Sequence, residues 1–355
     1  MSVNQELQDR AVQHAINIRR YGNGLAEKIV ALLDSVDEDL TAKLAAALAN
    51  VDERGIALPK TAQKRITQLL DELRALNAAI YLEVADTLSD ELTGLAKVEA
   101  AHQTAAITAA LPVSYATAIP TANRLKAIIE TSPMEGALLS SWTKGMEQGR
   151  IDRIEAAIRK GLVQGLGTDD IVRSIRGTKK LKYQDGILEI SRRSARSIVR
   201  TATTHVSNVA AQQTWKENEK VVKGWQFLST LDSRTTITCA ALSGQVFPIG
   251  EGPIPPRHIG CRSVSIAVTK SWREMGFDSD ELSPSERSSM DGQVAGDITF
   301  AEWLKKKGED TQNTILGPTR ASLFRDGQLS LSDFIKNDGT VLTLEQLRKQ
   351  YNLPN

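Results

Sequence analysis

Two cysteines and a histidine in one turn-rich stretch are the residues of this chain best suited to chemistry. Cys239, His258 and Cys261 offer two thiols and an imidazole, which are ligands that zinc prefers, and Asp232 offers a carboxylate oxygen as a fourth. The spacing His258-x-x-Cys261 suits a single ion, although the double Cys-x-x-Cys pattern of stronger zinc motifs is absent. The sequence therefore predicts a candidate zinc site here.

Two other interpretations of the same residues stay open. In the first, Cys239 and Cys261, which are the only cysteines of the chain, form a disulfide bond late, after the protein has left a reducing compartment. In the second, the thiols and the imidazole are simply buried packing groups. Asp232 then caps the turn, and Arg234 or Arg262 pairs with a carboxylate.

A cluster of basic residues is the second chemical feature. It consists of seven cations: Lys179, Lys180, Lys182, Arg192, Arg193, Arg196 and Arg200. Such a cluster predicts contact with DNA phosphates through the release of counterions. A solvated or subunit-facing surface is the alternative interpretation. The formal net charge of the whole chain is only +1, so the net charge favours neither DNA contact nor the alternative surface.

Motifs typical of enzymes are missing from the sequence. It contains no phosphate-binding Gly-x-x-x-x-Gly-Lys loop, no Gly-x-Ser-x-Gly turn and no His-Glu-x-x-His helix. A nucleophilic cysteine needs a base, but His258 and Cys261 are three residues apart in a loop, where such side chains seldom align. We therefore expect no enzyme activity and no required cofactor, with zinc as the one candidate.

The N-terminal third that precedes these residues is predicted to be helical. Apolar residues recur every three or four positions from Arg10 to Arg20, with a break at Gly22–Gly24 and Asp37 as a later helix N-cap. After Pro59 one apolar stripe continues to about Ala110, which predicts a helix roughly 75 Å long. Such a helix needs partners, either in an intramolecular bundle or as a docking arm for assembly.

The central elements flank the chemical residues directly. Apolar periodicity predicts a helix from 187 to about 215, with His205 buried on its apolar face. Alternating β-forming residues predict a strand at 221–228 and a partner strand at 262–268. Residues 283–295 are predicted to be a polar loop, and short helices follow.

These elements together predict an α+β fold that is mainly α. We expect an N-terminal helical bundle or arm (1–111), a small mixed α+β domain (134–270) and a tail of short helices and loops (271–355). Aromatic residues make up 5% of the chain, so the core must rely on aliphatic side chains, which suits helices. No segment approaches the ~20 apolar residues of a membrane span.

Motif order around the candidate site points to a known family. Asp232-x-Arg234-Thr235 leads to Cys239, then to a Leu-x-Gly244 turn, then to Pro255-Pro256-x-His258-x-x-Cys261-Arg262, and Arg200-Thr201 precedes them on the predicted helix. This order resembles the phage Mu F-like head-morphogenesis family over residues 187–270. Two positions depart from the family pattern: Ser263, where a second cysteine is common, and Ala202, where an acidic residue is common.

The resemblance implies a structural minor head protein of a tailed bacteriophage that takes part in procapsid or head assembly. Its implied partners are the portal protein and other phage head proteins, with packaged DNA as a further partner. The implied location is the virion, in the head or portal region, in several copies made in the host cytoplasm. The alternative from the residues themselves is a zinc-stabilised nucleic-acid-binding module.

Overall fold

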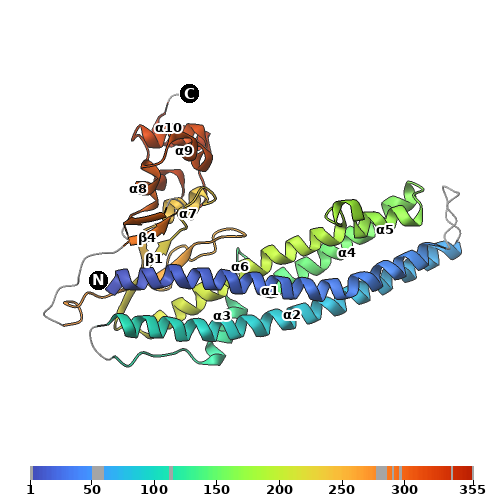
Figure 1. The fold of residues 1–355 in the computed structure, drawn as a ribbon, viewed down its shortest axis with the longest axis horizontal. Helices are drawn as coiled ribbons and strands as arrows, with labels where there is room; N and C mark the ends of the chain where they lie inside the picture. The colour runs from blue at the N-terminus through green and yellow to red at the C-terminus, as the bar shows by residue number, and fades with distance from the viewer. Residues whose placement is uncertain are drawn as a thin grey trace. The chain divides into compact units, whose positions relative to one another are not determined.

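The computed structural model describes residues 3–49, 60–111, 115–276, 286–289, 292–295, 298–336 and 339–353 (Figure 1). It is 67% helical and has a small antiparallel sheet of three strands, so the predicted mainly-α α+β class is confirmed. Two compact units divide the chain. We call Arg20–Thr93 with Glu130–Ala202 the helical unit, and Met1–Arg19, Gly94–Ile129 and Thr203–Asn355 the mixed unit. The three continuous domains expected from the sequence stay a prediction.

The helices before the sheet are α1 (Val3–Leu48), α2 (Lys60–Ala110), α3 (Ala122–Thr131), α4 (Leu139–Val163), α5 (Thr168–Arg176) and α6 (Ile187–Glu217). The next elements are β1 (Val222–Leu228), α7 (Ile237–Leu242), β2 (Val246–Phe247), β3 (Val264–Thr269), β4 (Glu286–Ser289) and β5 (Gly292–Ala295). The last helices are α8 (Phe300–Lys305), α9 (Glu309–Leu316), α10 (Pro318–Arg325) and α11 (Leu344–Tyr351). Among the described residues, no helix is both long and apolar enough to cross a membrane.

Helix α1 corrects two sequence predictions. It continues without a break through Gly22–Gly24, and Asp37 lies inside it instead of capping a second helix. A glycine inside a helix costs about 1 kcal/mol relative to alanine. Here the neighbouring Ala26 and Ile29 are completely buried, and their burial offsets that cost. Packing, which local propensity does not report, therefore keeps the helix intact.

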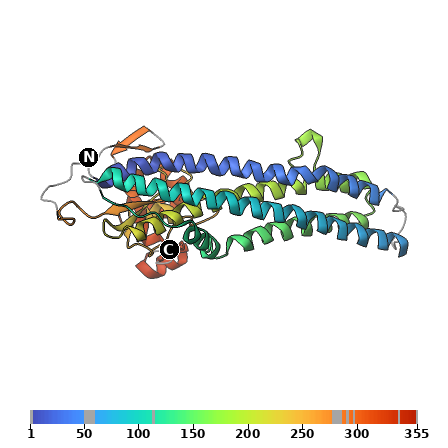
Figure 2. The same cartoon turned by 90° about the horizontal axis from the view of Figure 1, so that it is seen from below.

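The helical unit is an intramolecular bundle. Within it, the second half of α1 lies along the first half of α2 (Figures 1 and 2), and both pack on α4, α5 and the start of α6. The shared core is aliphatic, with Leu40, Leu44, Leu73, Ile154 and Ile175 fully buried. Of the two roles expected for the N-terminal helices, intramolecular packing is therefore observed. Helix α2 has 51 residues, which confirms the predicted long helix.

Asp37 is the charged centre of this bundle. Its carboxylate accepts hydrogen bonds from Arg150 on α4 and from Arg192 on α6, and Arg192 also donates to Asp34. Only 1% of the Arg150 side chain is exposed to solvent. Because a buried guanidinium is stable only when paired, the ion pair between Asp37 and Arg150 holds α1 and α4 in register.

The mixed unit is built on the sheet order β2-β1-β3, with every pair antiparallel. The predicted strands at 221–228 and 262–268 are confirmed as β1 and β3, and Trp225 pairs with Ala267 across them. Trp225 and Phe227 are completely buried in a core that also contains Trp215 of α6. Helix α6 confirms the helix predicted from 187, and His205 on it is buried as expected.

The C-terminal helices form a second core in the mixed unit. Phe300, Trp303 and Phe334 are almost completely buried, and they pack in one cluster with Leu231 and Ala240 from the segment before β2. The predicted short helices are therefore confirmed, and they belong to the packed unit. The predicted polar loop at 283–295 was partly wrong, because 286–289 and 292–295 pair as β4 and β5, and its other residues lie outside the described ranges.

A buried carboxylate lies in the mixed unit where α1, α2 and α6 meet. Glu99 is 1% exposed and accepts hydrogen bonds from His14 Nε2 at 2.8 Å, Gln103 Nε2 at 2.7 Å and Ser207 Oγ at 2.7 Å. Burial opposes its ionisation, but these donors outweigh burial and lower the pKa of Glu99. His102 stacks on His14 with 3.6 Å between ring centroids, and burial and the neighbouring imidazole lower its pKa.

Removing the carboxylate of Asp37 should destabilise the protein strongly. In Asp37→Ala, Arg150 stays buried without its partner, so we expect a loss of about 3–5 kcal/mol in the free energy of unfolding. Denaturant unfolding followed by circular dichroism measures the loss. Asp39→Ala is the control, because Asp39 is 56% exposed and its loss should change stability by only about 0.5 kcal/mol. Equal stability of the two variants would contradict this account.

The lowered pKa of His102 predicts that the stability of the protein depends on pH. As pH falls below the ordinary histidine value of 6.5, the unfolded chain takes up a proton that folded His102 refuses, so stability falls as acidity rises. Replacing His102 with glutamine removes this titration. The drop in the free energy of unfolding between neutral pH and pH of about 5 should therefore be smaller in His102→Gln than in the unmodified chain. Identical drops would show that another group causes the dependence.

Candidate metal centre

The excursion between β1 and β3, residues 229–263, positions the predicted site residues. Its one helix, α7, begins after Thr236, whose side-chain oxygen accepts the N–H of Cys239 at 3.4 Å. This cap places Cys239 in the first turn of α7, where the residue is 1% exposed. The local sequence therefore turns the Cys239 thiol toward the interior of the excursion.

The other two residues come from the turn that precedes β3. The N–H of Cys261 donates to the carbonyl oxygen of His258 at 3.0 Å, and Gly260 between them has a φ of +78°, a conformation that favours glycine. The Pro255–Pro256 peptide bond that leads into this turn is cis. Cys261 is buried, whereas His258 is partly exposed.

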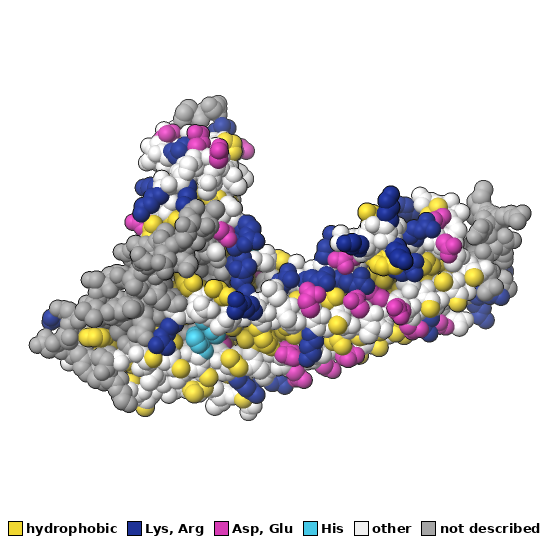
Figure 3. Space-filling view, viewed as in Figure 1, with side chains coloured by type: hydrophobic (Ala, Val, Ile, Leu, Met, Phe, Trp, Pro, Cys, Tyr) yellow, Lys and Arg dark blue, Asp and Glu magenta, His cyan; other side chains and the backbone are white. Residues whose placement is uncertain are grey.

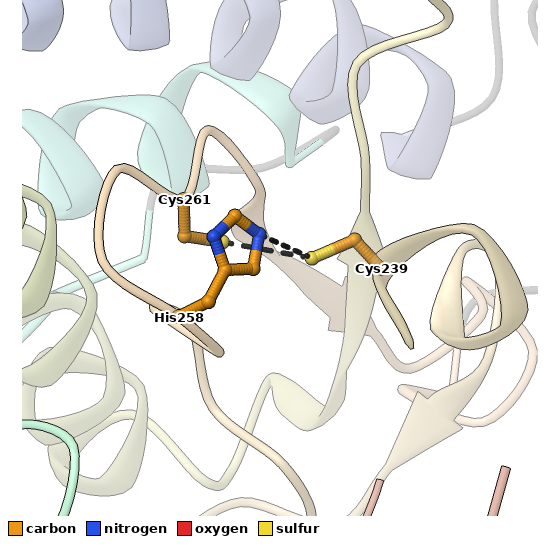
Figure 4. A group of neighbouring side chains, drawn as sticks. All are labelled: Cys239, His258 and Cys261. Carbon is orange, nitrogen blue, oxygen red and sulfur yellow. Dashed lines mark hydrogen bonds between the residues drawn. The ribbon is translucent and has the colours of Figure 1, made fainter. Parts of the chain in front are cut away.

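These three side chains point toward one another (Figure 4). Cys239 Sγ lies 3.7 Å from Cys261 Sγ and 3.5 Å from His258 Nε2. All three potential ligand atoms lie within 4.8 Å of one another. The tertiary structure thus brings together the three residues that the sequence nominated as soft ligands.

Hydrogen bonding sets the tautomer of His258. Its Nδ1 lies 3.0 Å from the carbonyl oxygen of Ile259. A carbonyl oxygen can only accept, so Nδ1 carries the hydrogen and donates it. In the neutral imidazole the lone pair therefore lies on Nε2, the nitrogen that faces Cys239. Metal-binding histidines in proteins commonly have this arrangement.

The two thiols differ in their ionisation. A hydrogen bond from Cys239 lowers the pKa of Cys261 to about 4 against the opposing effect of burial. The same contact with Cys261, together with burial, raises the pKa of Cys239. The contact therefore favours the thiolate form at Cys261, and the thiolate is the form that binds metals.

Asp232, the suggested fourth ligand, is placed differently. The group of close ligand atoms does not include it. Both of its carboxylate oxygens accept from the guanidinium of Arg262, and Oδ1 also accepts the N–H of Arg234 at 3.0 Å. Burial opposes the ionisation of Asp232, but the ion pair with Arg262 outweighs it and lowers its pKa. Asp232 thus has the turn-capping and pairing role that the sequence offered as the alternative.

The remaining motif residues shape the excursion. Thr235 donates its hydroxyl to the carbonyl oxygen of Thr230, which closes the turn after β1. Gly244 has a φ of +89°, and its N–H donates to the carbonyl oxygen of Phe227 at 2.8 Å. Arg234 is 75% exposed. Arg200 is exposed on the part of α6 that belongs to the helical unit.

Two members of the basic cluster form ion pairs within the helical unit. Arg192 pairs with Asp34 and Asp37, and Arg196 pairs with Glu27 at 2.9 Å and Glu189 at 3.5 Å. The exposed members are Lys179, Lys180, Lys182, Arg193 and Arg200. In the space-filling view, cationic and acidic side chains are interspersed over the part of the helical unit that carries α5 and α6 (Figure 3). Arg192 and Arg196 therefore join helices within the helical unit, and contact of the basic cluster with DNA stays a prediction.

Sequence reasoning missed one polar anchor of the site. Asn208 on α6 is buried, and its Oδ1 accepts the N–H of Ser265 on β3 at 2.8 Å. Its Nδ2 donates to the carbonyl oxygen of Thr204 at 2.8 Å. Asn208 thus fixes β3, and with it the turn of Cys261, against α6. The available signal was an amide next to the predicted apolar face of this helix, which includes His205 and Val209.

The ion pair of Asp232 predicts a pH-dependent loss of stability. In Asp232→Asn, Arg262 keeps a hydrogen-bond acceptor but loses the opposite charge, so we expect a loss of about 1–3 kcal/mol at neutral pH. Because the pKa of Asp232 is lowered in the folded protein, the stability that the ion pair provides is lost as pH falls through that lowered pKa. At still lower pH, Asp232→Asn and the unmodified chain should have similar free energies of unfolding. Denaturant unfolding at several pH values measures it. The control is Glu219→Gln, at an exposed position. If the difference in stability between Asp232→Asn and the unmodified chain stayed constant at all pH values, the ion pair of Asp232 would not be the cause of the pH dependence.

Comparison with known proteins agrees with the motif. A scan against models of protein families matches residues 152–266 to the family described as phage Mu protein F like protein. The match contains Asp232, Cys239, His258 and Cys261, and it begins earlier than the resemblance seen in the sequence, within α4. Searches of curated proteins and of solved structures each returned no match. The match covers less than half of the chain, and it supports the phage Mu protein F like family for residues 152–266.

Proposed function

We propose that this protein is a structural minor head protein of a tailed bacteriophage, incorporated during procapsid assembly close to the portal. The observation that carries the proposal is the family match over residues 152–266, whose members are phage head-morphogenesis proteins. The portal protein and other head proteins are the proposed partners. We also propose, from similarity to the family, that each particle contains several copies of the protein and that the protein is ejected with the DNA.

The architecture supports a role in assembly. Helix α2 has 51 residues and is therefore about 75 Å long, which gives it an extended outer surface for contact with neighbouring subunits. One side of α1 and α2 is already buried in the helical unit. Docking through the outer side thus needs no unfolding of the bundle.

Side-chain pairing disfavours the nucleic-acid-binding module as the main function. Arg192 and Arg196 are neutralised by carboxylates within the protein, so they release few counterions on contact with phosphate. The exposed Lys179, Lys180 and Lys182 suit weak, salt-dependent contact with packaged DNA. We propose DNA as a secondary partner only.

Analysis of particles tests the main proposal. Procapsids and mature virions of the phage that encodes this chain are purified, and their proteins are identified by mass spectrometry, with a phage replication protein as the negative control. We expect the chain in procapsids, and crosslinks between it and the portal protein. A nonsense mutation in its gene should lower the yield of infectious particles. Absence of the chain from both kinds of particle would refute the proposal, and presence without portal crosslinks would refute the proposed location.

A separate measurement tests the secondary role. Binding of the full chain to duplex DNA should weaken steeply with salt and weaken further when Lys179, Lys180 and Lys182 are all changed to glutamine. Changing Arg193 alone, which is 62% exposed and borders Glu189, should have a smaller effect. Tight binding that survives the triple change would favour the nucleic-acid-binding alternative.

A further inference from the structure

We propose that Cys239, His258 and Cys261 bind one zinc ion, which ties helix α7 to the turn before β3. The inference is independent of the proposed role in the phage head, because it rests only on the geometry of these side chains. The metal would crosslink an excursion that has little regular secondary structure between Phe247 and Val264.

The distances between the side chains fit tetrahedral zinc. Zinc lies about 2.3 Å from a thiolate sulfur and about 2.0–2.1 Å from an imidazole nitrogen. At the tetrahedral angle these lengths require about 3.8 Å between two sulfurs and about 3.6 Å between sulfur and nitrogen. The observed separations are 3.7 Å for Cys239 Sγ to Cys261 Sγ and 3.5 Å for Cys239 Sγ to His258 Nε2. Two of the ligand-to-ligand distances that tetrahedral zinc requires are therefore already present.

The same distances argue against the two other interpretations. A disulfide bond requires about 2.05 Å between sulfurs, and both cysteines are free. Simple burial explains the low exposure of the thiols, but it does not explain why three potential ligand atoms, one of them from a partly exposed histidine, converge within 4.8 Å of one another. The hydrogen bond from Nδ1 to Ile259 directs the Nε2 lone pair of His258 toward the thiols.

Charge balance also favours a divalent ion. Two thiolates and one neutral imidazole around Zn²⁺ give a group with no net charge, which can be buried at lower cost than a free thiolate. Zinc would also remove the remaining thiol proton, because coordination requires the deprotonated form. Soft sulfur ligands select zinc over magnesium or calcium, which prefer oxygen.

The fourth coordination position is assigned to water. Within the described part of the chain, the cluster contains only these three potential ligands, and the nearest candidate from the motif, Asp232, is held by Arg262. Partial exposure of His258 gives solvent access to the site. The proposal is therefore a Cys₂His site completed by one water molecule.

Metal analysis of the full chain tests the proposal. The protein is expressed without a metal-binding tag, purified without chelator, and its zinc is measured by mass spectrometry. We expect about one zinc per chain, and at least a tenfold lower content in Cys261→Ser and in His258→Gln. Asp232→Asn is the matched control and should keep its zinc. Cobalt substitution should show a thiolate-to-cobalt charge-transfer band that is lost in Cys261→Ser.

The unmodified chain decides the question even if a variant fails to fold. Circular dichroism first shows which variants are folded. Less than about a tenth of a zinc ion per chain, with two thiols that react after denaturation, would support simple burial and overturn the proposal. A mass two hydrogens lower, with no reactive thiol, would show a disulfide and overturn it equally. Zinc that remains at one per chain in folded Cys261→Ser and His258→Gln would place the metal elsewhere.

Discussion

The Mu F-like segment depends on the ordering of a long excursion that has little regular secondary structure. Between β1 and β3 the chain makes one short helix, whose Ala240 and Leu242 pack into the hydrophobic cores, and two sets of polar contacts hold the rest. The ion pair of Asp232 and Arg262 joins the start of the excursion to its end. The cluster of Cys239, His258 and Cys261 joins its middle to the same turn. Because each contact joins residues that are far apart in the sequence, ordering one end of the excursion restricts the conformations of the other end.

Buried polar pairing is a principle that both units share. In the helical unit Asp37 and Arg150 connect α1 to α4, and in the mixed unit Glu99 collects donors from α1, α2 and α6. Each group would be costly to bury alone and is stable only in its complete set. Such sets specify the register of long helices, whose aliphatic faces could otherwise slide by a turn at little cost.

Part of the site could be predicted from residue order. The soft-ligand set of Cys239, His258 and Cys261 was visible, because few residue types bind metals and they stood close in the chain. The role of Asp232 was uncertain between metal ligand and ion-pair partner, since a carboxylate serves both. Only the position of Arg262 decided it. The ion pairs of Arg192 and Arg196 on α6 could not be predicted for a related reason: Glu27, Asp34 and Asp37 lie far from them in sequence.

Short-range patterns determined the elements. The apolar period of α6 and the alternation of β1 and β3 reflect which face each segment buries, and that information is local. Tertiary structure alone decided which elements pair, because contacts such as Asp37 with Arg150, 113 residues apart, leave no local trace. It also decided that α1 passes through Gly22–Gly24 unbroken, since the energy that offsets the glycines comes from helices elsewhere in the chain. Residue order thus specified the parts and the candidate ligands, whereas long-range burial and charge pairing determined their arrangement.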